Sequence, residues 1–288
     1  MLAHDLTNSK SIGLVGMEKN VGKTTVLNYL LDKFRETKIL ITSIGRDGED
    51  TDVVTNTVKP KIFVQAGTFF ITTEKLLVLC DTTKEIVYTT NINTPLGRVI
   101  VVHALSSGFV QLGGPGIVSQ LTGLISELKL LYMFEKIITD GAINRKSIAS
   151  PTLADAVILC TGAALDSTIE RIVEKTSLAV KILTLPKAKS YGAIHLPGLV
   201  TDKRIEGLEK SIKDKEIVAD DTSKIFVSEK MLRRITLNGA TLAVQNPVNL
   251  AAVTINPISP RGFQFDKDEF LGKMQTAITL PIYNVNEG

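Results

Sequence analysis

The sequence predicts an α/β fold in which a mainly parallel sheet is flanked by helices. Residues 12–15 form a short apolar run that enters a glycine-containing loop, and from Lys23 onward apolar residues recur with helical spacing. A second apolar run, at residues 38–44, indicates another buried strand. Strand, helix and strand in this order make a βαβ unit, whose right-handed crossover leaves the two strands parallel.

The next part of the chain departs from this alternation. Between residues 47 and 116, β-branched and aromatic runs predominate, chiefly at 61–73 and 98–112. The small residues at 106–108 are typical of a hairpin turn. These features predict an antiparallel β-rich insertion near 47–116.

The alternation of strands and helices resumes after the insertion. Ser167 and Glu170 have the spacing of a capping box at the start of a further helix. The other elements expected here are a helix over 118–128, a strand over 136–139, a turn at Asp140 and Gly141, and a strand over 154–159.

A domain boundary is expected at residues 186–197, where prolines, glycines and lysines interrupt two periodic segments. Residues 1–185 then form one domain, and 186–288 form a smaller C-terminal α/β region that is either separate or continuous with the first. The elements expected in this region are strands at 225–227, 240–244, 252–255 and 280–285, and a helix over 266–277 that Asp266 caps.

Composition narrows the class of protein. The 288 residues carry a net charge of +3, which is too small to indicate a nucleic-acid or membrane partner. Cys80 and Cys160 lie in apolar runs without metal-ligand spacing, so buried reduced thiols are expected. No uninterrupted apolar segment reaches the length of a membrane span. The sequence therefore predicts a cytoplasmic protein.

The loop after residue 15 has the parts of a phosphate-binding loop, or P-loop. Such a loop needs backbone N–H groups at a helix N-terminus, a lysine that reaches the β and γ phosphates, and a hydroxyl that holds magnesium. Gly22, Lys23 and Thr24 supply these parts. With the βαβ unit, the loop predicts a P-loop NTPase-like fold that binds ATP and Mg²⁺. The expected nucleotide-binding residues are Gly16, Lys19, Asn20, Val21, Gly22, Lys23, Thr24 and Thr25.

The spacing of this loop differs from the usual pattern. Five residues separate Gly16 from Gly22, where four are usual. Either Met17 takes the place of the first glycine in a loop of ordinary length, or Gly16 takes it in a loop that is one residue longer. We favour the longer loop.

The metal site is expected to combine Thr24 with a carboxylate at a strand end. Asp140, directly after the strand at 136–139, is the first candidate, and Asp47 and Glu49 follow the second strand. Arg145 and Lys146 are each expected to contact phosphate, an acidic partner or solvent. The glycine-rich segment 113–116 is either an anion site or a turn, and no residue stands out as catalytic.

Two resemblances extend this interpretation. The five-residue loop spacing resembles that of dethiobiotin synthetase and the cobyric acid synthases. Five blocks in order also resemble the smaller subunit of the lysine aminomutase reactivase; these are residues 16–25, 43–49, 94–98, 140–147 and 256–260.

The reactivase resemblance implies a chaperone-like function in lysine fermentation. It implies that the chain works with a larger MutS-like ATPase subunit to restore an adenosylcobalamin-dependent aminomutase whose cofactor is damaged. The alternatives are a stand-alone ATP-dependent ligase or synthetase resembling dethiobiotin synthetase, and a regulatory module that binds nucleotide without hydrolysis. ATPase activity of the chain itself is left open, because binding needs fewer groups than turnover.

Overall fold

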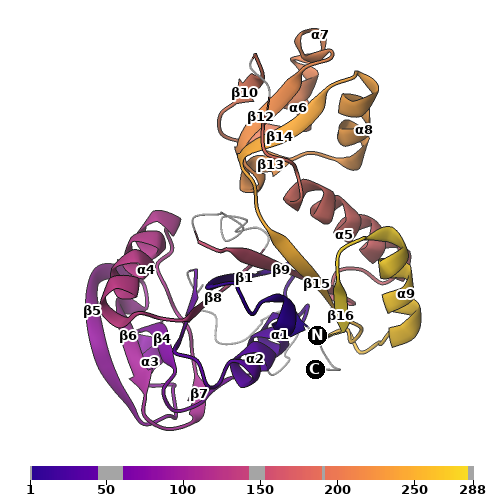
Figure 1. Cartoon of the computed structure of the whole chain (residues 1–288). Helices are drawn as coiled ribbons and strands as arrows, with labels where there is room; N and C mark the ends of the chain where they lie inside the picture. Colours follow the sequence, from indigo (N-terminus) through magenta and orange to yellow (C-terminus); the bar gives the residue numbers. More distant parts are fainter. Residues whose placement is uncertain (1, 45–60, 143–152, 190–191, 285–288) are drawn as a thin grey trace.

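The computed structural model describes residues 2–44, 61–142, 153–189 and 192–284 (Figure 1). Its centre is a nine-stranded sheet, parallel from β16 through to β4 and antiparallel only at β4, β6 and β5. The predicted mainly parallel α/β architecture is thus confirmed. The strand order is β16 (Ile282–Asn284), β15 (Leu250–Asn256), β9 (Ala156–Gly162), β1 (Ser11–Gly16), β8 (Lys136–Ala142), β2 (Ile39–Ser43), β4 (Phe69–Thr73), β6 (Gly97–Ala104) and β5 (Lys84–Thr94).

Helices cover both faces of this sheet. α1 (Leu2–Asp5) and α2 (Lys23–Lys33) pack with one set of strand residues, which includes Leu14 and Ile138. On the other face, α4 (Val118–Tyr132), α5 (Ile169–Leu183) and α9 (Lys267–Ala277) pack with a second set, which includes Val15 and Ile137. Neighbouring residues on a strand belong to opposite cores because side chains alternate across a strand.

The described part of the β-rich insertion enlarges the central sheet. β5 and β6 form its antiparallel hairpin, with Pro95 and Leu96 at the tip, and α3 (Glu74–Leu77) follows β4. The hairpin predicted at 106–108 is wrong, because β7 (Gly108–Val110) pairs with β3 (Ile62–Val64) and β6 pairs with β4 and β5.

A smaller lobe with its own hydrophobic core stands beside the central sheet (Figure 1). Its three parallel strands are β10 (Ile194–Leu196), β12 (Glu216–Asp221) and β14 (Thr241–Asn246). The lobe also contains β11 (Val200–Thr201), α6 (Asp202–Glu206), α7 (Glu209–Ile212), the 3₁₀ helix η2 (Thr222–Lys224), β13 (Ile225–Phe226) and α8 (Glu229–Leu237).

The chain returns from this lobe to the central sheet. β15, α9 and β16 follow β14, and β15 pairs in parallel with β9. The region predicted as 186–288 is therefore divided: its first part, through β14, builds the lobe, and its last part completes the sheet.

Three local predictions can be compared with the structure. Asp266 caps α9, as expected, by accepting hydrogen bonds from the N–H groups of Asp268 and Glu269. The capping box at Ser167 is wrong, since α5 begins after Thr168 without a side-chain cap. The turn at Asp140 is also wrong, because this residue continues β8 in register with Leu14 of β1.

In the described residues, no helix combines the length and the apolar character that crossing a membrane requires.

Candidate functional site

The predicted phosphate loop joins β1 to α2 at the carboxyl edge of the sheet. Asn20 and Gly22 have left-handed backbone conformations, with φ of 62° and 88°. Gly22 directly precedes the first turn of α2, and no side chain caps that turn. The first N–H groups of a helix have no partner within the helix and carry partial positive charge. This amino end therefore has the features of an anion site.

Three contacts anchor the loop. The N–H of Met17 donates to the carbonyl of Cys160 on β9, with an N to O distance of 2.9 Å. The side chain of Val21 is fully buried in the core on the α2 face. The side-chain amide of Asn256, at the end of β15, donates to the carbonyl of Asn20 at 3.4 Å. Predicted site residues 16–25 thus form one anchored loop and the first turn of α2.

Gly16 has a steric function at the start of this loop. A Cβ atom at this position would lie 2.6 Å from Lys23 Nζ and 2.7 Å from Lys23 Cδ. The Lys23 side chain therefore folds back over the end of β1, and only glycine leaves room for it. This contact favours the longer loop, in which Gly16 is the first glycine.

The topology of the sheet places a switch point beside this loop. The chain leaves β1 towards β2 and leaves β9 towards β15, so neighbouring strands connect in opposite directions. The two crossover helices, α2 and α5, accordingly lie on opposite faces. In open α/β sheets, ligands bind at such a switch point outside the carboxyl ends of the strands.

Asp140 lies near the carboxyl end of β8, next to β1. Its Oδ1 atom is inaccessible to solvent and has no hydrogen-bond partner among the described residues. Burial raises the pKa of the Asp140 carboxyl, while the charge of Lys23 and a hydrogen bond from the N–H of Gly141 act in the opposite direction. A buried carboxylate oxygen without a partner is costly, and a cation would compensate it.

The other metal candidates differ in what the structure shows of them. Thr24 lies in the first turn of α2 and is half-buried. Asp47 and Glu49 lie outside the described residues, as do Arg145 and Lys146. Within the described ranges, no group of three or more His, Cys, Asp or Glu side chains could hold a metal ion. A site with one carboxylate, hydroxyls, phosphates and waters fits Mg²⁺, which takes few protein ligands.

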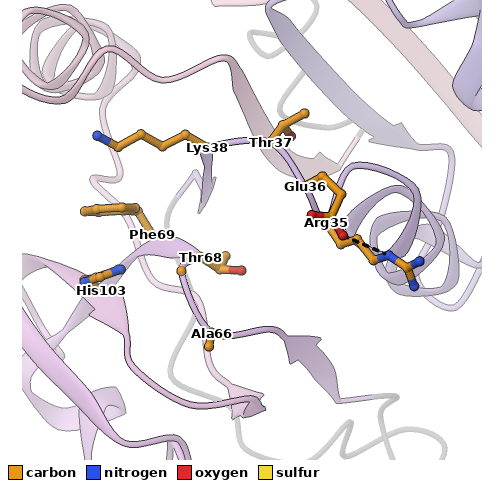
Figure 2. Close-up of a pocket in the computed structure, with 9 residues that line it drawn as sticks. Arg35, Glu36, Thr37, Lys38, Ala66, Thr68, Phe69 and His103 are labelled. Carbon is orange, nitrogen blue, oxygen red and sulfur yellow. Dashed lines mark ion pairs between the residues drawn. The ribbon is translucent and has the colours of Figure 1, made fainter.

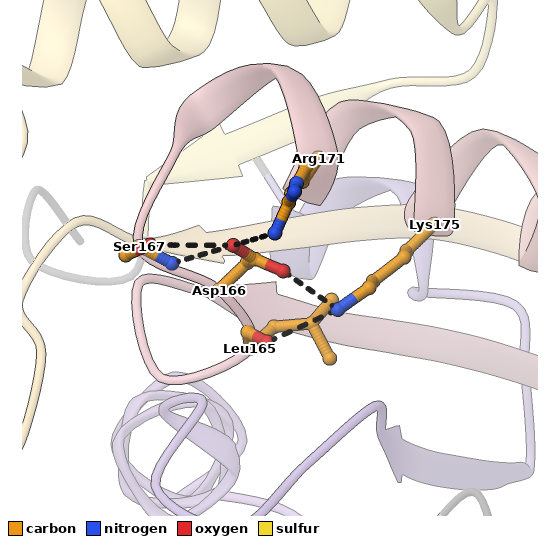
Figure 3. Close-up of polar contacts among 5 residues, drawn as sticks. All are labelled: Leu165, Asp166, Ser167, Arg171 and Lys175. Atoms are coloured by element: carbon orange, nitrogen blue, oxygen red, sulfur yellow. Dashed lines mark hydrogen bonds and ion pairs between the residues drawn. The ribbon is translucent and has the colours of Figure 1, made fainter.

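The loop between β9 and α5 forms another part of the carboxyl edge. Asp166 accepts hydrogen bonds from the N–H of Ser167 and from Lys175 Nζ, both at 2.8 Å, and Arg171 lies at 4.0 Å (Figure 3). The hydrogen bond from Lys175 is the main cause that lowers the pKa of Asp166. Because these partners occupy its carboxylate, Asp166 is a weaker metal candidate than Asp140.

A surface pocket of ≈ 450 Å³ lies at the opposite, amino-terminal edge of the sheet (Figure 2). It is lined by residues 35–38, 66–69 and His103. Lys38 Nζ lies 5.6 Å from the centre of the Phe69 ring, and His103 stacks on this ring with 4.4 Å between centroids. His103 Nδ1 is also 2.9 Å from a carboxylate oxygen of Glu85. Because its basic groups already have protein partners, this pocket is a weaker anion site than the loop.

Sequence reasoning missed two features of the carboxyl edge. A Cβ atom at Gly114 would overlap the carbonyl oxygen of Ser43, so close backbone approach explains the glycine-rich segment before α4. Asn256 contacts the phosphate loop across the sheet, and only its place at the end of an apolar run could have indicated this.

The remaining histidines and cysteines form no catalytic arrangement in the described structure. His195 hydrogen-bonds to Gln245 in the small lobe, and Cys80 and Cys160 are buried thiols that form no disulfide with each other.

Comparison with known proteins gave no match, either to protein-family models or to curated protein sequences.

Proposed function

We propose that this chain binds ATP with Mg²⁺ through residues 16–25 and Asp140, as a subunit of a chaperone-like factor that reactivates an adenosylcobalamin-dependent aminomutase. The observation that carries nucleotide binding is the arrangement of Lys23. Its side chain folds over Gly16 at an uncapped helix end, and its charge acts on the buried carboxyl of Asp140. A cation, free helical N–H groups and an unpartnered carboxylate oxygen are what a magnesium phosphate complex requires.

Each group has a distinct role in this proposal. The N–H groups at the start of α2 donate to phosphate oxygens, and Lys23 binds the β and γ phosphates. The hydroxyl of Thr24 and the carboxylate of Asp140 hold the magnesium ion. When bound, this ion neutralises phosphate charge.

The reactivating function rests on the resemblance of five sequence blocks, and their positions in the fold support it. Three of the blocks begin at the last residue of β1, β2 and β15, with Gly16, Ser43 and Asn256, and a fourth begins with Asp140, two residues before the end of β8. The fifth covers the tip of the β5–β6 hairpin. The first residues of four blocks that are far apart in the sequence thus lie along one edge of the sheet, as residues of a single site would.

Nucleotide can drive reactivation only if it binds two conformations of the factor with different affinity. Release of a damaged cofactor also requires contact with the aminomutase. The proposal therefore includes the larger MutS-like ATPase subunit and the aminomutase as protein partners.

The nucleotide part is tested by titration calorimetry with a non-hydrolysable ATP analogue and Mg²⁺. Lys23→Ala removes a charged donor to phosphate, so we expect its affinity to fall by about 100-fold. Lys33→Ala is the matched control, because Lys33 lies at the exposed far end of the same helix. Equal affinities for wild type and Lys23→Ala would contradict nucleotide binding at this loop.

The reactivating part is tested by adding the chain, the larger subunit and ATP to inactivated aminomutase. We expect activity to return with wild type and not with Lys23→Ala. Activity that returned equally with both would contradict the proposal. Turnover of ATP with a small carboxylate or amine and no partner would instead favour the stand-alone synthetase.

A further inference from the structure

Ser43 lies beside Asp140 at the carboxyl edge of the sheet. The two residues are paired in register across the parallel strands β2 and β8. Registered residues of neighbouring parallel strands direct their side chains to the same face. Ile41 and Ile138, two residues earlier on each strand, belong to the core on the α2 face. Ser43 and Asp140 therefore both face the side of α2 and the phosphate loop.

Each of these two residues has an unsatisfied oxygen. Ser43 Oγ and Asp140 Oδ1 are both inaccessible to solvent, and neither has a hydrogen-bond partner among the described residues. One such atom costs on the order of 1–3 kcal/mol, and a carboxylate oxygen costs more. Two of them side by side, one from a carboxylate and one from a hydroxyl, are the hard oxygen donors that Mg²⁺ prefers.

A neighbouring residue provides a contrast. Thr139 Oγ1 is likewise buried without a partner in the described structure. Thr139 alternates with Asp140 along β8, so its side chain faces the α4 side, as that of Ile137 does. Thr139 is therefore next to Asp140 in sequence, but its side chain lies on the opposite face of the sheet and cannot hold the same metal ion.

We propose that Ser43 Oγ holds the magnesium ion together with Thr24 and Asp140. This inference rests on the proposed nucleotide function. It explains why a hydroxyl at the end of β2 is buried without a partner among the described residues, and it assigns a second strand of the sheet to the metal site. Ser43 is the last residue of β2, so the ion would also fix the carboxyl end of this strand.

The test measures how much Mg²⁺ strengthens binding of a non-hydrolysable ATP analogue. Affinity is determined by calorimetry with EDTA and with saturating Mg²⁺, and the ratio of the two is the magnesium enhancement. We expect Ser43→Ala to lower this ratio about 10-fold or more while affinity in EDTA is unchanged. Thr139→Val, the matched control, should keep the ratio of wild type.

Stability provides a second measurement. If Ser43 Oγ has no protein partner, Ser43→Ala should not lower the melting temperature without metal. A normal ratio in Ser43→Ala, or equal losses in Ser43→Ala and Thr139→Val, would overturn the inference and leave nucleotide binding intact. Absence of any nucleotide binding by wild type would instead overturn the proposed function itself, and this inference with it.

Discussion

Strand β8 has a charged side chain near each end, and the two differ in whether described protein groups compensate the buried charge. At the amino end, Lys136 is buried, and its ammonium donates to the carbonyls of Leu6, Thr7 and Ser9 at 3.0, 2.6 and 2.7 Å. At the carboxyl end, Asp140 keeps a buried oxygen without a described partner. The protein compensates the first charge internally. In the proposed function the second binds a magnesium ion, so the same strand would be structural at one end and functional at the other.

Replacing the compensated charge should have the largest effect. Lys136→Met leaves three backbone carbonyls without their charged donor, and we expect the free energy of unfolding to fall by about 3 kcal/mol. Urea unfolding measures this loss. Nucleotide affinity of the folded fraction should not change, because the other end of β8 is untouched. If Lys136→Met lost no more free energy of unfolding than Lys33→Met, which replaces an exposed lysine, Lys136 would not be needed for stability.

At the carboxyl end of β1, Gly16→Ala should lower nucleotide affinity without lowering stability. The added Cβ would lie 2.6 Å from Lys23 Nζ, so it must displace this side chain. We expect affinity for the ATP analogue to fall about 10-fold, because a charged hydrogen bond to phosphate is weakened. Gly123→Ala is the control, since a Cβ at Gly123 in α4 meets no atom within 4 Å. Unchanged affinity in Gly16→Ala would contradict the assigned position of Lys23.

Asp140→Asn should stabilise the protein when no metal or nucleotide is bound. The folded-state pKa of Asp140 is raised above 3.8, so the folded protein binds its proton more tightly than the unfolded chain does. Stability then falls as pH rises from 3.8 through the folded-state pKa. The asparagine variant does not lose stability in this way, so at pH 7 its melting temperature should exceed that of wild type. This difference between the two melting temperatures should shrink as the pH is lowered.

This comparison is made in EDTA, at several pH values between 7 and 4. With the ATP analogue and Mg²⁺ present, wild type should become the more stable protein, since only its carboxylate binds the ion. A wild type that is already more stable than Asp140→Asn in EDTA at pH 7 would mean that the interactions of the carboxylate with Lys23 and Gly141 outweigh the cost of its burial.

The smallest effect is expected for Lys38→Met at the amino edge. Lys38 is exposed, and its ammonium lies 5.6 to 5.9 Å from the rings of Phe69, Tyr132 and Phe134. Cation–π contacts at exposed sites contribute about 0.5–1 kcal/mol, and methionine keeps the apolar contact with the rings. Thermal unfolding should show a loss in this range. If Lys38→Met lost as much stability as Lys136→Met, the exposed and the buried lysine at this edge would not differ in their contribution to stability.

Local patterns predicted the parts of the fold that local interactions determine. The strand, loop and helix around Lys23 depend on the spacing of apolar residues and on glycine, which can be recognised in one stretch of sequence. Asp266 was likewise recognised as a helix cap, because its partners are its own neighbours.

Pairing between distant strands could not be predicted in this way. The apolar run in β15 fits the small lobe as well as the central sheet, and only its ladder with β9 decides between them. The turn at 106–108 has the composition of a hairpin, yet β7 pairs with β3. At the site, Lys23 and Thr24 follow from the loop pattern, whereas a lone serine such as Ser43 becomes notable only when register places it beside Asp140.

Helix α5 packs against two hydrophobic cores, that of the central sheet and that of the small lobe. Ile169 and Ile172, near the loop that holds Asp166, and Leu183 at the far end pack in the core of the central sheet, whereas Ile182 packs in the core of the small lobe. Its 15 residues span about 22 Å. In the proposed function, this continuous helix is the direct structural connection between the nucleotide edge of the central sheet and the small lobe, where a second protein could detect a change.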